Sequence, residues 1–313
     1  MTYKEWCEIA PRTESQKSAY RKKIVKQNIV GTSMVILPFL GFLCFTLFPM
    51  LLSLALAFSN LRSALISEAT FDAGLKNFIY VIKDEYTWKA MRTTLVYSLT
   101  TFLNVAIAVF LASVMNRHIY GKKFYFVLFF LPQVCSSVAV AMMWRWVFAE
   151  NGVINAFRLV GGKSAIDFFT DANYYMFAIF VMSVWKNGTN IVILLSAFSA
   201  INKSLQEAAR LDGADEMHVF WNVTFPQLTP TIFYLITMNL IASLQEQALF
   251  QLINTSATGP NFWGLTLTYQ MYRLMNVNLQ YGLSCAMSWF IGIFILIVTK
   301  INFALSEKWV SYD

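Results

Sequence analysis

Long apolar runs separated by charged positions dominate the pattern along this chain. Six such intervals contain no charged side chain apart from Lys186 in the fourth. A bilayer core about 30 Å thick needs roughly 20 residues of apolar helix, so each interval is long enough for one span. The pattern therefore predicts an all-α integral membrane protein with six transmembrane helices, within residues 27–61, 93–116, 124–144, 172–202, 219–245 and 274–299.

A polar stretch lies between the fourth and fifth intervals: SLQEAARLDGADEMHVFWNVTFPQLTP, residues 204–230. Ser204 and Glu207 have the spacing of a capping box, which predicts that a helix begins there. Gly213 either lets another backbone approach closely or breaks the helix in two. The stretch is therefore expected to form a helix-turn-helix.

The charges of this stretch favour a protein partner over a lipid surface. Helices that lie on membranes usually carry Lys and Arg on their polar face. Here Arg210 stands against four carboxylates, those of Glu207, Asp212, Asp215 and Glu216.

The composition also indicates a membrane protein. Of the 313 residues, 57% are hydrophobic and 13% charged, against about 25% charged in soluble domains.

The distribution of basic residues predicts the orientation of the chain. Cytoplasmic flanks of membrane spans are enriched in Lys and Arg. Both termini are therefore expected in the cytoplasm, because the basic residues gather before the first interval and after the second: Arg12, Lys17, Arg21, Lys22, Lys23, Lys26, Arg117, Lys122 and Lys123.

This topology explains the net charge of +7 better than nucleic-acid binding does. It places residues 62–88, 149–171 and 251–273 on the outer side of the membrane and residues 204–230 in the cytoplasm. The first apolar interval is too long for a signal-peptide core, so it is expected to remain as an anchor. The basic segment 1–28 either anchors the topology or lies on anionic lipid as an amphipathic helix.

The sequence contains no recognisable catalytic, metal-binding or cofactor-binding motif. Gly162-Lys163-Ser164 has Phe157 where a P-loop requires glycine. The two histidines, His118 and His218, have no matching triad or metal spacing. The cysteines are too widely spaced for redox or metal chemistry, at positions Cys7, Cys44, Cys135 and Cys285.

The segment EAARLDGA followed by FWNVTFPQLTP resembles the EAA loop of permease subunits in binding-protein-dependent ATP-binding-cassette (ABC) importers. Across residues 30–305, further stretches such as FFLPQVCSSVAVAMMWRWVFAENGVINAF resemble the first permease of the carbohydrate branch, which includes the maltose and glycerol-phosphate importers. Thr258-Gly259-Pro260 departs from the Gly-Gly-Pro that is frequent there.

The resemblance implies a type I permease domain at residues 29–305 in the bacterial cytoplasmic membrane, with a short cytoplasmic tail at 306–313. It implies a coupling loop at 203–226 that docks onto a separate ATPase through Glu207, Ala208, Ala209, Asp212 and Gly213. It also implies a second homologous permease, an ATPase dimer that binds ATP and Mg²⁺, and an extracytoplasmic solute-binding protein.

Polar residues inside the apolar intervals are candidates for the cargo pathway. Charged side chains in spans are costly and usually face a cavity or a partner charge, so Lys186 and Glu246 either pair or face the cargo. Helical spacing aligns Asn239, Ser243 and Glu246 on one stripe, and Ser183, Asn187 and Asn190 on another. These polar positions and the family resemblance together give the candidate residues for the cargo pathway: Gln133, Ser137, Ser183, Lys186, Asn187, Asn239, Ser243 and Glu246.

Hydroxyl and amide groups suit a sugar, and Trp185 or Trp289 could stack on a sugar ring, whereas the charge of the cargo stays open. Two other functions remain as alternatives. One is a membrane enzyme that uses Lys186 and Glu246 on a lipid-linked substrate. The other is a secondary transporter, which should show inverted repeats and broken helices.

Overall fold

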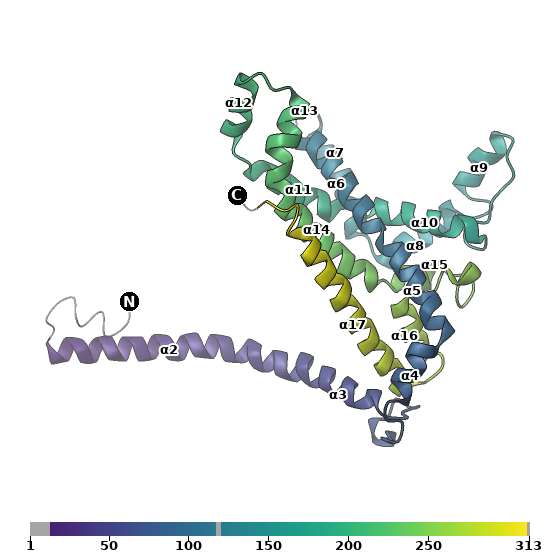
Figure 1. The fold of residues 1–313 in the computed structure, drawn as a ribbon, viewed down its shortest axis with the longest axis horizontal. Helices are drawn as coiled ribbons and strands as arrows, with labels where there is room; N and C mark the ends of the chain where they lie inside the picture. Colours follow the sequence, from purple (N-terminus) through teal and green to yellow (C-terminus); the bar gives the residue numbers. More distant parts are fainter. Residues whose placement is uncertain (1–12, 117–119, 312–313) are drawn as a thin grey trace. The chain divides into compact units, whose positions relative to one another are not determined.

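The computed structural model describes residues 13–116 and 120–311, and its regular elements in these ranges are helices (Figure 1). The chain divides into two compact units, Met1–Leu56 and Ala57–Asp313. An all-helical protein agrees with the prediction from the apolar intervals.

The first unit is built on one long apolar helix. Helix α2 (Glu14–Phe42) continues through a single π-helical turn (Leu43–Leu47) into α3 (Phe48–Ala57). The stretch Lys22–Ala57 is long and apolar enough to cross a membrane. A helix that is apolar on all sides is typical of a membrane span. This confirms a span-capable helix in the first apolar interval.

The second unit contains the remaining helices. They are α4 (Lys76–Lys83), α5 (Glu85–Ser98), α6 (Thr100–Asn116), α7 (Lys122–Val134), α8 (Ser137–Val147), α9 (Val153–Val160), α10 (Ala172–Trp185), α11 (Gly188–Ala200), α12 (Lys203–Leu211), α13 (Glu216–Val219), α14 (Phe225–Leu244), α15 (Ala248–Ile253), α16 (Leu267–Asn276) and α17 (Tyr281–Ser306).

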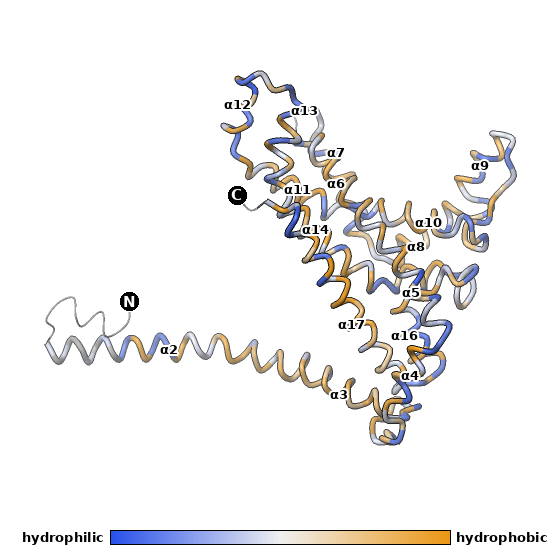
Figure 2. The backbone as a smooth tube through the Cα atoms, viewed as in Figure 1, coloured by the Kyte–Doolittle hydropathy of each residue, from blue (hydrophilic) through white to orange (hydrophobic). Residues whose placement is uncertain are grey.

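Three further stretches are long enough and apolar enough to span a membrane: Glu85–Asn116, Glu216–Leu244 and Tyr281–Ser306. Hydrophobic residues run along α14 and α17, whereas α12 carries mainly hydrophilic ones (Figure 2). Two bent helix pairs, α7 with α8 and α10 with α11, pass the same test when each pair is taken as one span. The described residues therefore provide four candidate spans, or up to six.

The third apolar interval is not one straight helix, contrary to the continuous apolar run in the sequence. Helix α7 ends at Val134, Cys135 is extended, and α8 leaves at 103° to α7. Pro132 lies in the last turn of α7, where its ring excludes the regular helical hydrogen bond. Hydropathy records only that both halves are apolar, so it does not reveal the bend.

Small residues let the central helices approach closely. Ala108 and Ala112 of α6 are fully buried where α6 packs on α11 and α14, beside Leu194 and Leu228. At the start of α11, a Cβ on Gly188 would lie 2.6 Å from the carbonyl oxygen of Phe129 in α7. This contact holds the beginning of α11 against α7, and thereby positions the break between α10 and α11.

Candidate functional site: a polar cavity and an acidic helix pair

A polar cavity of about 180 Å³ lies within the second unit, between α5, α6, α8, α10, α14 and the segment after α14. Lys186 and Glu246 both face it. Six of the eight residues predicted for the cargo pathway line this cavity: Ser137, Ser183, Lys186, Asn239, Ser243 and Glu246.

The two charged residues of the cavity do not form an ion pair with each other. Lys186 follows the last residue of α10, and its Nζ donates to Ser137 Oγ at 3.3 Å. Glu246 lies just beyond α14, and its Oε1 accepts from the backbone N–H of Leu249 at 3.0 Å. The ion pairs of the described residues lie elsewhere. The carboxylate therefore satisfies a free amide in the first turn of α15, where a negative charge is favourable.

Three asparagines form an amide cluster at one edge of the cavity, which Asn239 also lines. Asn187 donates to the backbone oxygen of Asn104 at 2.6 Å, and Asn190 donates to Asn187 Oδ1 at 2.6 Å. Asn239 Nδ2 donates to Asn190 Oδ1 at 3.0 Å. These bonds join α6, α11 and α14, so the buried Asn187 is engaged in helix association and does not line the cavity.

The helical stripes expected from the sequence are interrupted. The spacing of Ser183, Asn187 and Asn190 assumes a continuous helix, but α10 ends at Trp185 and α11 begins at Gly188 with a bend of 45°. Ser183 consequently lines the cavity while Asn190 belongs to the amide cluster. On the other stripe, Glu246 lies outside α14.

Two other candidate groups lie apart from the cavity lining. Gln133 is half-buried on α7. Trp185 stands edge-on to Trp144, with ring centroids 5.7 Å apart, and Trp289 packs against the apolar cluster around α17. The structure thus assigns packing contacts to both tryptophans.

Sequence reasoning missed one wall of the cavity. Tyr97, Thr100, Thr101 and Asn104 line it from α5 and α6. Thr101 Oγ1 lies 3.3 Å from Ser243 Oγ, and Asn104 Oδ1 is buried without a hydrogen-bond partner in the described chain. Their spacing of three, four and seven residues marks one helix face. The same search for polar stripes, applied to the second apolar interval, would have found them.

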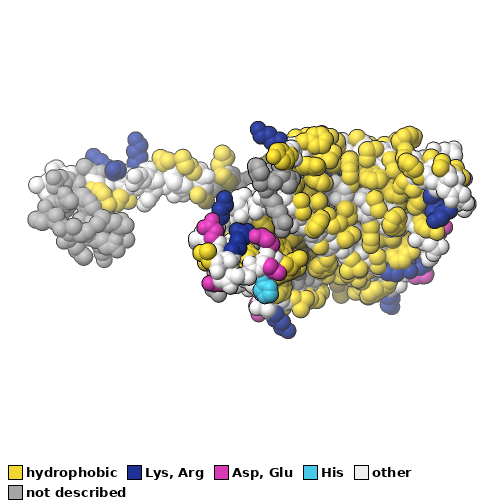
Figure 3. Space-filling model, turned by 90° about the horizontal axis from the view of Figure 1, so that it is seen from above, with side chains coloured by type: hydrophobic (Ala, Val, Ile, Leu, Met, Phe, Trp, Pro, Cys, Tyr) yellow, Lys and Arg dark blue, Asp and Glu magenta, His cyan; other side chains and the backbone are white. Residues whose placement is uncertain are grey.

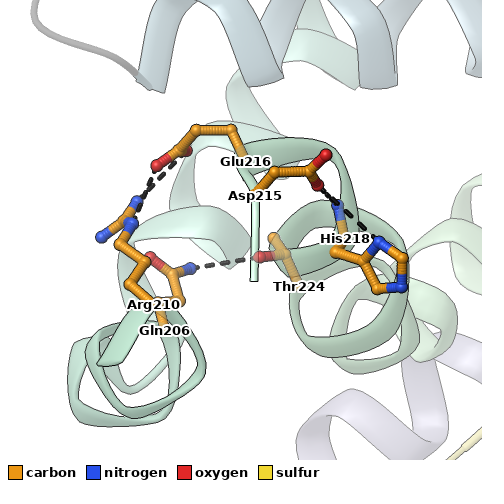
Figure 4. Close-up of polar contacts among 6 residues, drawn as sticks. All are labelled: Gln206, Arg210, Asp215, Glu216, His218 and Thr224. Atoms are coloured by element: carbon orange, nitrogen blue, oxygen red, sulfur yellow. Dashed lines mark hydrogen bonds and ion pairs between the residues drawn. The ribbon is translucent and has the colours of Figure 1, made fainter. Parts of the chain in front are cut away.

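Helices α12 and α13 form the acidic pair expected between α11 and α14 (Figure 4). A helix begins here as predicted, at Lys203, but Ser204 is not its N-cap. Asn202 is the N-cap of α12, and its Oδ1 accepts from the Ser204 backbone N–H at 3.0 Å and from the Ser204 hydroxyl at 2.9 Å. Asn is as strong a cap as Ser, and here it takes precedence over the capping-box pattern two residues later.

Side-chain bonds hold the two helices together. Arg210 Nε and Nη2 donate to the two carboxylate oxygens of Glu216 at 2.8 and 3.2 Å, and this hydrogen bonding raises the pKa of Arg210. Gln206 donates to Thr224 Oγ1 at 3.2 Å, and Asp215 caps α13 through the His218 backbone N–H (Figure 4). The bidentate contact between Arg210 and Glu216 fixes the orientation of α12 and α13 as well as the distance between them.

Gly213 lies in a break between two helices. Of the two interpretations of this glycine, a helix break and a close approach of another backbone, the structure supports the first. Helix α12 ends at Leu211, and Gly213 has φ +87° in the turn before α13. A Cβ at this position would meet no atom within 4 Å, so the described chain supplies no closely approaching backbone. Glu207, Ala208 and Asp212 are exposed, and acidic side chains gather on this surface (Figure 3).

Comparison with known proteins identifies relatives over most of the chain. The family described as "Binding-protein-dependent transport system inner membrane component" matches residues 104–310. The chain is 33% identical over 298 residues to the probable ABC transporter permease protein YesP of Bacillus subtilis, covering 93% of this chain and 95% of that protein. It is 30% identical over 265 residues to the sn-glycerol-3-phosphate transport system permease protein UgpA of Agrobacterium fabrum, covering 83% and 89%.

Solved structures with the same fold are also known. A bacterial ABC transporter involved in the import of the acidic polysaccharide alginate superposes with a TM-score of 0.79 at 22% identity, covering 92% of this chain and 99% of that one. A second structure of an alginate ABC transporter contains a periplasmic protein with bound alginate pentasaccharide, and also has a TM-score of 0.79. At this identity the similarity concerns the fold.

Proposed function

This chain belongs to the family of binding-protein-dependent transport system inner membrane components, and from that premise we propose that it imports a sugar or sugar derivative as one permease of an ABC importer. The observation that carries the cargo proposal is the polar cavity among apolar helices. Its serine, threonine and asparagine side chains provide the donors and acceptors that hydroxyl groups need. Relatives named for sn-glycerol-3-phosphate and alginate transport support the same class.

The size of the cavity supports a site shared between two permeases. Its volume of about 180 Å³ is below the roughly 300 Å³ at which pockets for drug-sized ligands begin. We therefore propose that this chain supplies one wall of the pathway and that a second, homologous permease supplies the other. Cargo would reach this pathway from an extracytoplasmic solute-binding protein.

The membrane arrangement follows when each bent helix pair is counted as one span. The chain then crosses six times, which places both termini on one side of the membrane. The basic flanks favour the cytoplasm for that side. In this arrangement residues 1–28 and 306–313 are cytoplasmic, and residues 29–305 form the permease domain.

The α12–α13 pair is the proposed contact with a cytoplasmic ATPase dimer, which would hold the ATP and Mg²⁺. The pair is exposed and acidic, and the Arg210–Glu216 bonds make it a unit that can transmit force. Glu207, Ala208, Ala209, Asp212 and Gly213 are its proposed docking residues. The alternatives of a membrane enzyme and a secondary transporter predict no such ATPase.

Co-purification from native membranes tests this proposal. The tagged chain, extracted in mild detergent, should bring down a second permease and an ATPase with Walker motifs, identified by mass spectrometry. Gly213→Val should weaken ATPase recovery by about five- to thirtyfold, because a β-branched residue at this left-handed position costs about 1–2 kcal/mol. Isolation of the chain without either partner, under conditions that preserve other membrane complexes, would contradict the importer proposal.

Two controls separate backbone strain from bulk. Gly213→Asn should retain the ATPase, because asparagine tolerates positive φ. Gly292→Val lies on α17 with open space around the added Cβ and no positive φ, and should also retain it. Equal ATPase recovery with Gly213→Val and Gly213→Asn would show that the turn conformation does not control docking.

A further inference from the structure

We infer that the cargo of this permease carries an anionic group, a carboxylate or a phosphate on a sugar, and that Lys186 binds that group. This inference rests on the proposed function. It concerns the chemical class of the cargo, which the hydroxyl and amide groups of the cavity leave open.

Lys186 presents a positive charge to the cavity without a carboxylate partner. Its Nζ donates to the neutral hydroxyl of Ser137 at 3.3 Å, and no carboxylate of the described chain lies within ion-pair distance. A lysine within a membrane-spanning segment is costly unless a compensating group is present. An anion in the cavity would provide that compensation.

The acidic residue of the cavity is hydrogen-bonded to the backbone of the same chain. Glu246 accepts the Leu249 backbone N–H at 3.0 Å at the start of α15, and its own backbone oxygen accepts the Thr266 hydroxyl at 2.8 Å. The titratable groups that line the cavity are Glu246, Lys186 and Tyr97. Glu246 Oε1 is thus bonded within the protein, and Lys186 is the charged donor that the cavity presents to a ligand.

The donor chemistry of lysine selects the class of group. An ammonium has three donors and no acceptor, whereas a sugar hydroxyl needs both, and the cavity already supplies hydroxyl groups through Ser183 and Thr101. Carboxylate and phosphate oxygens only accept. Charge-assisted bonds to such oxygens are about twice as strong as neutral ones. Lys186 therefore contributes most to the binding of an anion whose oxygens only accept hydrogen bonds.

Polar groups on the other walls of the cavity fit the rest of such a ligand. Thr101 and Asn104 line the cavity from α6, and Ser137 and Ser183 line it from α8 and α10. Hydroxyl and amide groups can bond the hydroxyls of a sugar. The cavity thus presents a cation at the α10–α11 break and neutral polar groups on its other walls, which together fit a sugar acid or sugar phosphate.

The test uses the complete importer, with its partner permease, ATPase and solute-binding protein, reconstituted in proteoliposomes. Four probes are compared: trigalacturonate, its methyl ester, sn-glycerol-3-phosphate and maltotriose. Uptake and probe-stimulated ATP hydrolysis should be seen with an acidic probe and not with the methyl ester or maltotriose. The two acidic probes distinguish a carboxylate from a phosphate.

Substitutions at position 186 then test the residue itself. Lys186→Gln should raise the KM for the acidic probe about ten- to hundredfold, and Lys186→Arg should restore most of it, because the loss is that of one charged hydrogen bond. Lys308→Gln, beyond the end of α17, is the matched control and should leave KM unchanged. The same solute-binding protein is used with every permease variant, so its own preference for a probe does not affect the comparison between variants.

The inference is overturned if no acidic probe stimulates the importer, whether or not a neutral sugar does. It is also overturned if Lys186→Gln transports the acidic probe as the wild type does. The proposed function has its own test in the co-purification experiment, whose result does not depend on the cargo, so the two can fail separately.

Discussion

Polar residues in the second unit fall into two groups according to whether their bonding is complete. Asn187, Asn190 and Asn239 bond to one another or to backbone oxygens, which ties three helices together. Lys186 faces the cavity with a charge that no carboxylate of the described chain pairs with, and the buried Asn104 Oδ1 has no hydrogen-bond partner in that part of the chain. The same residue types therefore serve helix association in one place and proposed cargo binding in the other.

The Asn190–Asn239 pair should contribute measurably to stability. Asn190→Ala and Asn239→Ala should each lower the free energy of unfolding by about 1 kcal/mol, with a coupling energy of about 0.6 to 1.7 kcal/mol in the double variant, because each amide bonds the other across helices. Unfolding in mixed detergent micelles gives these values. Asn276→Ala is the control, since its amide donates to Tyr272 within the same helix. Additive effects of the two substitutions would contradict the proposed coupling.

Helix boundaries, at the scale of the element, control what each polar residue can reach. The break between α10 and α11 places Lys186 at a helix end, and the break between α7 and α8 frees Ser136 and Ser137 from a continuous helix. Helix α12 likewise begins at its Asn202 cap. The function of these segments thus depends on where the helices stop.

Capping of α12 provides a direct test of its boundary. Asn202→Ala should destabilise the helix by about 1 kcal/mol and speed amide hydrogen exchange across residues 203–211 about fivefold. Ser204→Ala should have a smaller effect, because Ser204 donates to the cap and does not accept a helix amide in this structure. A larger effect from Ser204→Ala would restore the capping-box assignment. Hydrogen exchange measured by mass spectrometry distinguishes these outcomes.

For the whole molecule, family membership and apolar helices agree on a multi-pass inner-membrane component. The family match begins at residue 104, inside α6, and extends to residue 310 beyond α17. It therefore includes the bent pairs, the acidic helix pair and most of the cavity lining. The first unit carries a helix that is long and apolar enough to cross a membrane.

Labelling with a membrane-impermeant maleimide tests the orientation. In a background without the native cysteines, Ser256→Cys should react in intact spheroplasts, because residues 251–273 are expected outside. Lys308→Cys should react only after permeabilisation, because the six proposed spans would return the chain to the cytoplasm. Both positions are exposed in the structure, so accessibility within the chain does not differ between them. Reaction of Lys308→Cys in intact spheroplasts would overturn the proposed topology.

The sequence by itself determined the helical membrane class, the positions of the apolar segments and the acidic EAARLDGA stretch. Each depends on composition and local order, because lipid demands long apolar helices whatever their packing. Only the tertiary structure decided that the Lys186 and Glu246 side chains do not pair, that Asn187 joins an amide cluster, and that α6 supplies a cavity wall. Those outcomes depend on bends of 45° and 103°, which residue spacing along a continuous helix does not contain.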